Sequence, residues 1–243
     1  SMRACDRVIT ISTDMVQHLR LAYGLEQIRL IPNLSPGKLH ALPVEEAKAA
    51  RGWRDKMVVQ YSGNFGFAHE YQTLLDVIRR LRHREDILFH IAGAGSNYER
   101  LLEATRGLPN VLFEGYAPLD RLEWHLGAAD LSVVVFNEAF RSVLMPSKYY
   151  GILASGRAVL LISSGQNDIA RDILAEGIGL HFGHGEGAAI AHALEALASD
   201  PSRLRTMGRR SRALYERHYR SELFLEAYRD ALGLEAEMFF LMG

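Results

Sequence analysis

A serine, a lysine and a short apolar helix stand together within residues 144–162, and their order suggests an anion-binding site. Pro146 interrupts the preceding loop, and Ser147 and Lys148 then begin a helix that Gly156 ends. A hydroxyl, a cation and free backbone N–H groups therefore meet at the amino end of a helix, where the helix dipole favours negative charge. This arrangement suits a phosphate or a diphosphate.

Two glycine-containing loops are candidates to contact the same ligand. The first contains Gly63 and Gly66 and follows an apolar strand, and the second contains Gly93 and Gly95 and follows the next strand. Glycine lets the backbone approach a ligand closely. Together with the long segment 137–148, these loops are expected to form one rim of a cleft.

The elements that position these loops alternate between strands and helices. Near-continuous apolar strands indicate a parallel sheet that helices cover on both faces. We therefore expect an α/β fold with a doubly wound, mostly parallel six-stranded sheet and extra C-terminal helices, and a ligand at the carboxyl ends of the strands. The six strands are expected near 57–61, 87–92, 111–114, 131–136, 158–162 and 179–182.

The two ends of the chain are built differently. Two short strands, 6–12 and 28–31, flank a helix that Thr13 and Asp14 are expected to cap, and residues 32–44 form a proline-rich linker. The last third of the chain predicts three helices, over 186–199, 201–219 and 221–240.

The composition argues against several classes of protein. A net charge of −1, from 28 basic and 29 acidic residues, gives no electrostatic footprint for nucleic acid. The single cysteine, Cys5, excludes an internal disulfide and fits a reducing compartment. No apolar stretch reaches the ~18 residues that a membrane span needs. The arginine runs at 79–82 and 209–212 are interpreted as solvated faces, with contact to anionic lipid as the alternative for the second.

In their order and spacing, six motifs resemble the carboxy-terminal half of a GT-B fold retaining glycosyltransferase. The resemblance runs from about residue 6 to 232, and its Pro-Ser-Lys motif is most similar to bacterial surface-polysaccharide enzymes. It implies a Rossmann-like domain that binds a nucleotide-sugar donor, UDP- or GDP-linked, with no cofactor and no metal, and a saccharide or lipid-linked acceptor. The motifs are 62–66, 91–95, 110–116, 128–131, 146–151 and 154–157.

The resemblance also implies a division of the chain. Residues 1–33 are interpreted as a remnant of an amino-terminal domain or as a linker, and 34–243 as the nucleotide-sugar-binding domain. In this family the acceptor lies on the amino-terminal domain, so we expect half an active site and almost no transfer by this chain alone. We expect a cytoplasmic location, with peripheral association of the full-length protein at the inner face of the membrane.

Carried onto this sequence, the family pattern assigns roles to individual residues. Lys148 and Asn64 are the expected catalytic groups, because they would stabilise charge on the leaving diphosphate. The plainer alternatives are a helix cap for Ser147 and His69, a loop aromatic for Tyr116, and solvated cations for Lys148 and Arg141. Arg157 is expected to neutralise the carbonyl end of the helix before it. The expected donor-binding residues are Gly63, Gly66, His69, Gly93, Gly95, Tyr116, Arg141, Ser147 and Lys148.

The chain departs from the family pattern at the ribose. Many relatives carry two glutamates eight positions apart, and the second binds the ribose. Alignment on 154–156 places Val143 and Gly151 at these positions, so neither carboxylate exists here.

Functions of other classes remain open at this point. A nicotinamide-dependent oxidoreductase would use Gly93, Gly95 and an acid about 20 residues on, Glu114, although Tyr98 replaces the third glycine of that fingerprint. A non-catalytic sugar-nucleotide-binding subunit and a GT-B epimerase are further alternatives. His181 and His184 have a metal-like spacing, but no nearby residue completes a zinc site.

Overall fold

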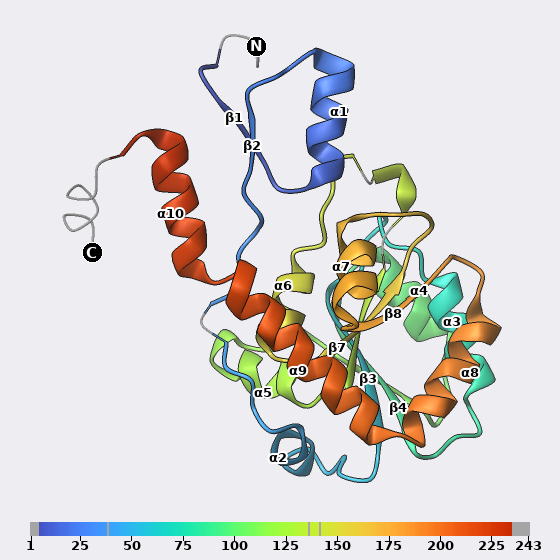
Figure 1. The fold of residues 1–243 in the computed structure, drawn as a ribbon. Helices are drawn as coiled ribbons and strands as arrows, with labels where there is room; N and C mark the ends of the chain where they lie inside the picture. Colours follow the sequence, from blue (N-terminus) through green and yellow to red (C-terminus); the bar gives the residue numbers. More distant parts are fainter. Residues whose placement is uncertain (1–4, 38, 136, 141, 235–243) are drawn as a thin grey trace.

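The structure, a computed structural model, describes residues 5–37, 39–135, 137–140 and 142–234. Its centre is a six-stranded sheet in which every neighbouring pair is parallel (Figure 1). The strand order is β5-β4-β3-β6-β7-β8. The strands are β3 Met57–Asn64, β4 Ile87–Ala94, β5 Val111–Glu114, β6 Leu131–Val135, β7 Ala158–Ile162 and β8 Gly179–Phe182. The doubly wound α/β fold is therefore confirmed.

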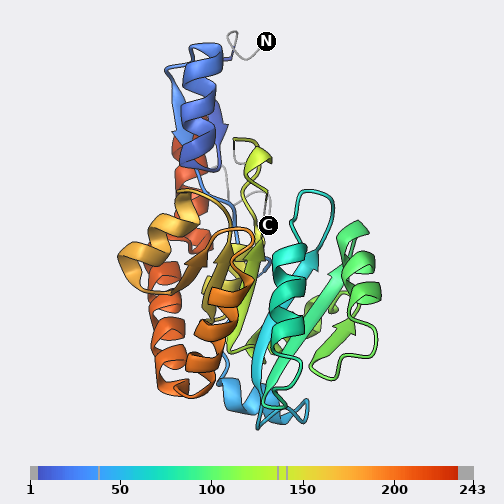
Figure 2. The same cartoon turned by 90° about the vertical axis from the view of Figure 1, so that its right-hand side faces the viewer.

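Helices cover both faces of this sheet, because side chains alternate between the faces along each strand. In β7, Leu160 packs in the core beneath α3, α4 and α8, whereas Leu161 packs beneath α5, α6 and α7. Helix α9 runs diagonally in front of the strands in Figure 1 and along one side of the molecule in Figure 2, and it packs on β7 and α6. The helices are α1 Thr13–Tyr23, α2 Val44–Ala49, α3 Gln72–Arg80, α4 Ser96–Ala104, α5 Leu122–Gly127, α6 Lys148–Ala154, α7 Asp168–Glu176, α8 Gly187–Ala198, α9 Pro201–His218 and α10 Ser221–Leu232.

A separate βαβ piece precedes the large sheet. Strands β1 (Val8–Thr10) and β2 (Ile28–Leu30) pair in parallel beside α1. Among the described residues, hydrogen bonds attach this piece to the rest at two places. Arg7 Nη1 donates to the carbonyls of Asp230 and Ala231, at 2.9 and 2.6 Å, and the Thr13 N–H donates to Asp168 Oδ2 at 2.8 Å. The cap of α1 is Ser12, whose Oγ accepts from the Met15 N–H, so the predicted Thr13-Asp14 cap is one residue late.

Some boundaries also differ from the expected ones. Strands β3 and β4 continue to residues 64 and 94, so the glycines at 63 and 93 still belong to the sheet. The last helix ends at Leu232, because Gly233 turns left-handed at φ 66°. Within the part of the chain that the structure describes, no helix is long and apolar enough to cross a bilayer.

Candidate functional site

A cavity of about 520 Å³ lies where the strand order reverses, between β3 and β6. Chain connections leave β3 and β6 in opposite directions, and this separation opens a crevice at the carboxyl ends of the strands. The second half of β3 and residues 132 and 133 of β6 form its floor, and α5, α6 and the loop before α6 form its walls. We call it the switch-point cavity; its lining includes Gln60, Ser62, Gly63, Asn64, His69, Tyr116, Ser132, Ser147 and Lys148.

Lys148 points into this cavity instead of into solvent. Its Nζ is buried, lies 3.5 Å from the centre of the Tyr61 ring and has no hydrogen-bond partner among the described residues. The ring face carries negative partial charge and attracts an ammonium group. A Cβ at Gly63 would lie 3.6 Å from Nζ, which is an ordinary contact, so glycine is favoured at this position by its φ of +126° and not by the lysine.

The electrostatics of the cavity favour an anionic guest. Burial lowers the pKa of Lys148 to about 7. Burial, and then the nearby Lys148, lower the pKa of His69 to about 4, so this imidazole is neutral at pH 7. The described lining residues include no aspartate or glutamate. A phosphate group would supply the missing counter-charge and favour the protonated lysine.

Two polar residues on the cavity floor were missed in the sequence. Gln60 Oε1 and Ser132 Oγ are buried and have no hydrogen-bond partner within the described residues. Both residues line the cavity and are register partners on β3 and β6. Buried polar atoms are normally paired, so unpaired ones in a cavity are candidates to bind a ligand. The available signal was one polar residue inside each of two apolar strands.

The structure brings six of the expected site residues together and places three others outside the cavity. Gly66, Gly93 and Gly95 do not line the switch-point cavity, and Arg141 lies outside the described residues. The six that line it are Gly63, Asn64, His69, Tyr116, Ser147 and Lys148.

Gly93 and Gly95 meet neighbouring backbone. A Cβ on Gly93 would lie 2.0 Å from the Gly63 carbonyl oxygen, and one on Gly95 would lie 2.6 Å from Phe65 backbone atoms. Both glycines also have φ near +135°. The carboxyl ends of β3 and β4, with the residues that follow them, therefore pack too closely for a side chain at either glycine, and this contact accounts for both glycines without a ligand.

At the two ends of α6, the structure shows neither a side-chain cap by Ser147 nor neutralisation of the carbonyl end by Arg157. Ser147 is the N-cap residue, but its side chain makes no capping hydrogen bond. Arg157 does not neutralise the carbonyl end of this helix, because its Nη2 donates to the Leu42 carbonyl. Arg212 of α9 donates to the Ala154 carbonyl instead. That expectation was wrong because Gly156 turns the chain and directs Arg157 towards the linker.

The residues that suggested other chemistry have partners. Glu114 bonds to Arg51 and to His90 Nε2, the latter at 2.9 Å. His181 Nε2 lies 2.8 Å from the Ser163 carbonyl oxygen, whereas His184 pairs with Glu70. His90, Glu114 and His125 have potential metal-ligand atoms that lie within 4.8 Å of one another. The Glu114 carboxylate, however, already forms an ion pair with Arg51.

The strand order and the crevice define the class: a Rossmann-like half of a GT-B fold. More than half of the chain, residues 56–200, matches the glycosyl transferases group 1 family, and the chain belongs to this family. The predicted family resemblance is thereby confirmed.

Individual relatives agree with this assignment. The sequence is 27% identical over 174 residues to WcaI of Escherichia coli K12, which is named as a colanic acid biosynthesis glycosyl transferase. That match covers 68% of this chain and 42% of WcaI, so the chain spans less than half the length of this relative.

Solved structures share the fold at low sequence identity. Sucrose-phosphate synthase from Thermosynechococcus elongatus superposes with a TM-score of 0.75 and 22% identity, over 95% of this chain and 59% of that one. The Anabaena protein HepE, solved with UDP and glucose, gives a TM-score of 0.76 and 15% identity, over 95% and 64% of the two chains.

Proposed function

We propose that this chain is the donor-binding part of a retaining glycosyltransferase. It would bind a nucleoside-diphosphate sugar in the switch-point cavity and present the sugar to a saccharide or lipid-linked acceptor. The observation that carries the proposal is Lys148, whose buried Nζ lacks a polar partner among the described residues and faces a cavity without acids. Support for a nucleotide sugar comes from the family and from HepE, which was solved with UDP.

The chemistry asked of the cavity is stabilisation of the leaving diphosphate. When the bond from the anomeric carbon to the diphosphate breaks, negative charge grows on the phosphate oxygens. A preorganised cation stabilises that charge best where water is excluded. Lys148 supplies the cation, and Asn64 and Ser147 supply hydrogen-bond donors at the rim. His69, neutral at pH 7, is positioned to donate a hydrogen bond to a phosphate or sugar oxygen without adding charge.

The acceptor belongs to a part of the protein outside this chain in our proposal. This rests on the length of WcaI, of which the match covers 42%. We assign residues 1–33 to that neighbouring domain or its connection, because β1 and β2 form a sheet of their own. The name of WcaI supports a role in surface-polysaccharide synthesis, and with it a cytoplasmic location at the inner face of the membrane.

A calorimetric panel tests the donor site. UDP, GDP, ADP, dTDP and NAD are titrated into the wild-type chain, and we expect UDP or GDP to bind with a Kd of order 0.1–1 mM. Lys148→Met should weaken the preferred diphosphate at least about tenfold. Arg210→Gln, which removes a positive charge far from the cavity, is the control. A preference for NAD over the diphosphates, or a diphosphate affinity that Lys148→Met leaves unchanged, would contradict the proposal.

A further inference from the structure

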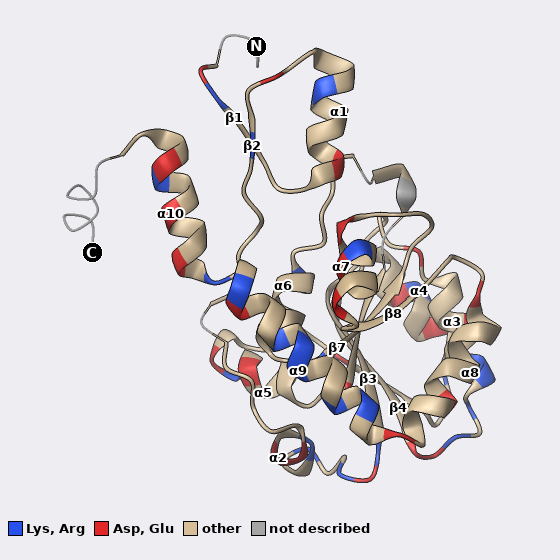
Figure 3. Cartoon of the chain, in the orientation of Figure 1, with Lys and Arg blue, Asp and Glu red and all other residues tan. Residues whose placement is uncertain are grey.

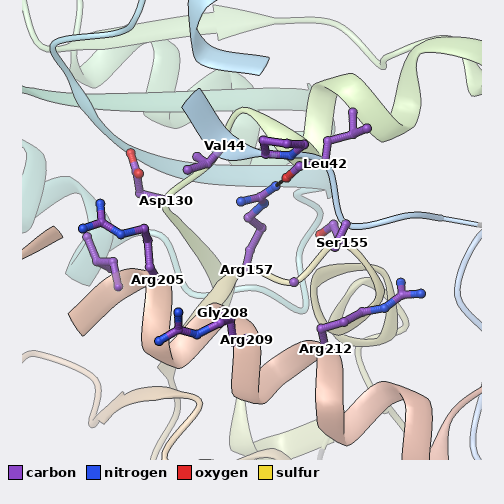
Figure 4. Close-up of a pocket in the computed structure, with 13 residues that line it drawn as sticks. Leu42, Val44, Asp130, Ser155, Arg157, Arg205, Gly208, Arg209 and Arg212 are labelled. Atoms are coloured by element: carbon purple, nitrogen blue, oxygen red, sulfur yellow. Dashed lines mark hydrogen bonds between the residues drawn. The ribbon is translucent and has the colours of Figure 1, made fainter. Parts of the chain in front are cut away.

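A second cavity, of about 330 Å³, lies at the other edge of the sheet (Figure 4). Asp130 and Arg157, which line it, directly precede β6 and β7, so it opens at the amino ends of these strands. The two cavities have no lining residue in common among those the structure describes. We call this second space the arginine cavity.

Arg157 is the buried cation of the arginine cavity. The residue is only 7% exposed, and its Nε has no hydrogen-bond partner among the described residues. Nη2 donates to the Leu42 carbonyl (Figure 4), so the hydrogen bond that Nε can donate is the one left unused. Burial lowers its pKa to about 10, although Asp130 and Glu45 partly oppose this. A buried charge of this kind is costly unless a counter-ion accompanies it.

Helix α9 brings further arginines to the same space. Arg205, Arg209 and Arg212 line the cavity, and basic residues recur along this helix in Figure 3. Arg212 is already used, by Glu216 and the Ala154 carbonyl. Arg205 and Arg209 have no carboxylate within 4.0 Å among the described residues; Arg209 only donates to Thr206 Oγ1, at 3.2 Å.

The negative groups at this cavity are occupied. Asp130 is the one carboxylate among the described lining residues, and it accepts from Lys48 Nζ at 3.0 Å and from the Val58 N–H at 2.8 Å. The carbonyl end of α6, which would repel an anion, is covered by Arg212. The cavity therefore keeps an excess of positive charge.

We propose that the arginine cavity binds a phosphate group, held by Arg157 at the start of β7 and by Arg205 and Arg209 from α9. Guanidinium groups match the oxygens of a phosphate with paired hydrogen bonds, and each charge-assisted bond is stronger than a neutral one. The phosphate could belong to a free anion or to a lipid headgroup. This site is separate from the donor cavity and does not depend on the proposed transferase function.

Two double variants test the site without disturbing the buried Arg157. Arg205→Gln with Arg209→Gln removes two cavity arginines, and Arg203→Gln with Arg210→Gln removes two charges from the same helix outside the cavity. Both are made in the Lys148→Met background, so that the switch-point cavity does not contribute. Inorganic phosphate is titrated by calorimetry. We expect the cavity variant to weaken phosphate binding about tenfold and the control to change it less than about twofold.

A vesicle arm separates the two sources of the phosphate. Sedimentation with phosphatidylglycerol vesicles is compared with phosphatidylcholine vesicles for the same variants. Selective loss of phosphatidylglycerol binding in the cavity variant supports a lipid headgroup, and selective loss of inorganic phosphate alone supports a free anion. Equal losses in the cavity and control variants, or no binding in either arm, would overturn the proposal.

Discussion

Lys148 Nζ lies 3.5 Å above the centre of the Tyr61 ring. Tyr61 in turn stacks on Phe65, with ring centres 4.1 Å apart, and its hydroxyl donates to the Asn64 carbonyl at 2.7 Å. An aromatic platform thus supports the lysine at the carboxyl end of β3. The platform replaces water but supplies no full negative charge, so the ammonium group is stabilised less than it would be in solution.

Replacing Lys148 by Met should stabilise the ligand-free protein. The folded pKa of about 7 lies below the ordinary value of 10.5, and each unit corresponds to about 1.4 kcal/mol. Lost contact with Tyr61 offsets part of this gain, so we expect a net increase in the free energy of unfolding of roughly 2 kcal/mol. Urea unfolding at pH 7 measures it. Lys48→Met is the matched control, and it should destabilise by about 3 kcal/mol because it leaves Asp130 buried without its cation.

The advantage of Lys148→Met should shrink as the pH rises. Between pH 7 and 10.5 the unfolded chain holds a proton on Lys148 that the folded chain has released, so the stability contributed by this group rises with pH. The difference in unfolding free energy between variant and wild type should therefore fall from about pH 7 to about pH 9.5. A difference that stays constant over this range would show that Lys148 has an ordinary pKa.

Diphosphate binding should take up a proton. At pH 8 the free Lys148 is mostly neutral, and an anion beside it would favour the charged form. Calorimetry of UDP or GDP binding in buffers of different ionisation enthalpy should show uptake approaching one proton at pH 8 and close to none at pH 6. Lys148→Met should show no uptake at either pH, and the same uptake in this variant would assign the proton to another group.

Gly93→Ala should be strongly destabilising. Its Cβ would meet the Gly63 carbonyl oxygen at 2.0 Å, and its φ of +136° is unfavourable for any side chain. We expect a loss of about 3 kcal/mol in chemical unfolding. Gly115→Ala is the control, because a Cβ there meets nothing within 4 Å. Equal stability of the two variants would contradict the close packing of the β3 and β4 loops.

Two substitutions at Tyr61 should separate the ring from the hydroxyl. Tyr61→Phe keeps the platform and removes the bond to the Asn64 carbonyl, so we expect about 1 kcal/mol less stability and a nearly unchanged diphosphate affinity. Tyr61→Leu also removes the ring face beneath Lys148, and affinity should fall about tenfold. For both variants, calorimetry measures the diphosphate affinity and urea unfolding measures the stability. Equal diphosphate affinity of the two variants would contradict a role of the Tyr61 ring in positioning Lys148.

The fold was largely predictable because each strand is a short apolar run between turn residues. Val111–Glu114, Ala158–Ile162 and Gly179–Phe182 have the expected bounds. Strands β1 and β2 are shorter than expected, and residue 136 of the strand expected over 131–136 lies outside the described residues. Strands β3 and β4 are longer than expected, because their glycines look like loop residues but remain paired in register, Gly63 with Gly93. Local composition does not reveal that two backbones approach too closely for a side chain.

The candidate site was predictable in position but not in detail. The order of strands places Gly63, Asn64 and Lys148 at one crevice, as expected. The burial of Lys148 over an aromatic ring was not predictable, because Tyr61 is a core residue by its pattern and meets the lysine only through the β3–α6 contact. The sequence also did not reveal that Arg212, and not Arg157, donates to the carbonyl end of α6. Arg212 lies on α9, which is far from α6 along the chain and meets it only in the folded structure.

The hydrogen bonds that attach the opening βαβ piece reach widely separated parts of the chain. Arg7 donates hydrogen bonds to the carbonyls of residues 230 and 231 near the end of α10, and the Thr13 N–H donates one to Asp168 at the start of α7. Rotation of this piece about one attachment would break the hydrogen bonds of the other attachment. Separation of this piece from the large sheet therefore requires the hydrogen bonds of both Arg7 and Thr13 to break.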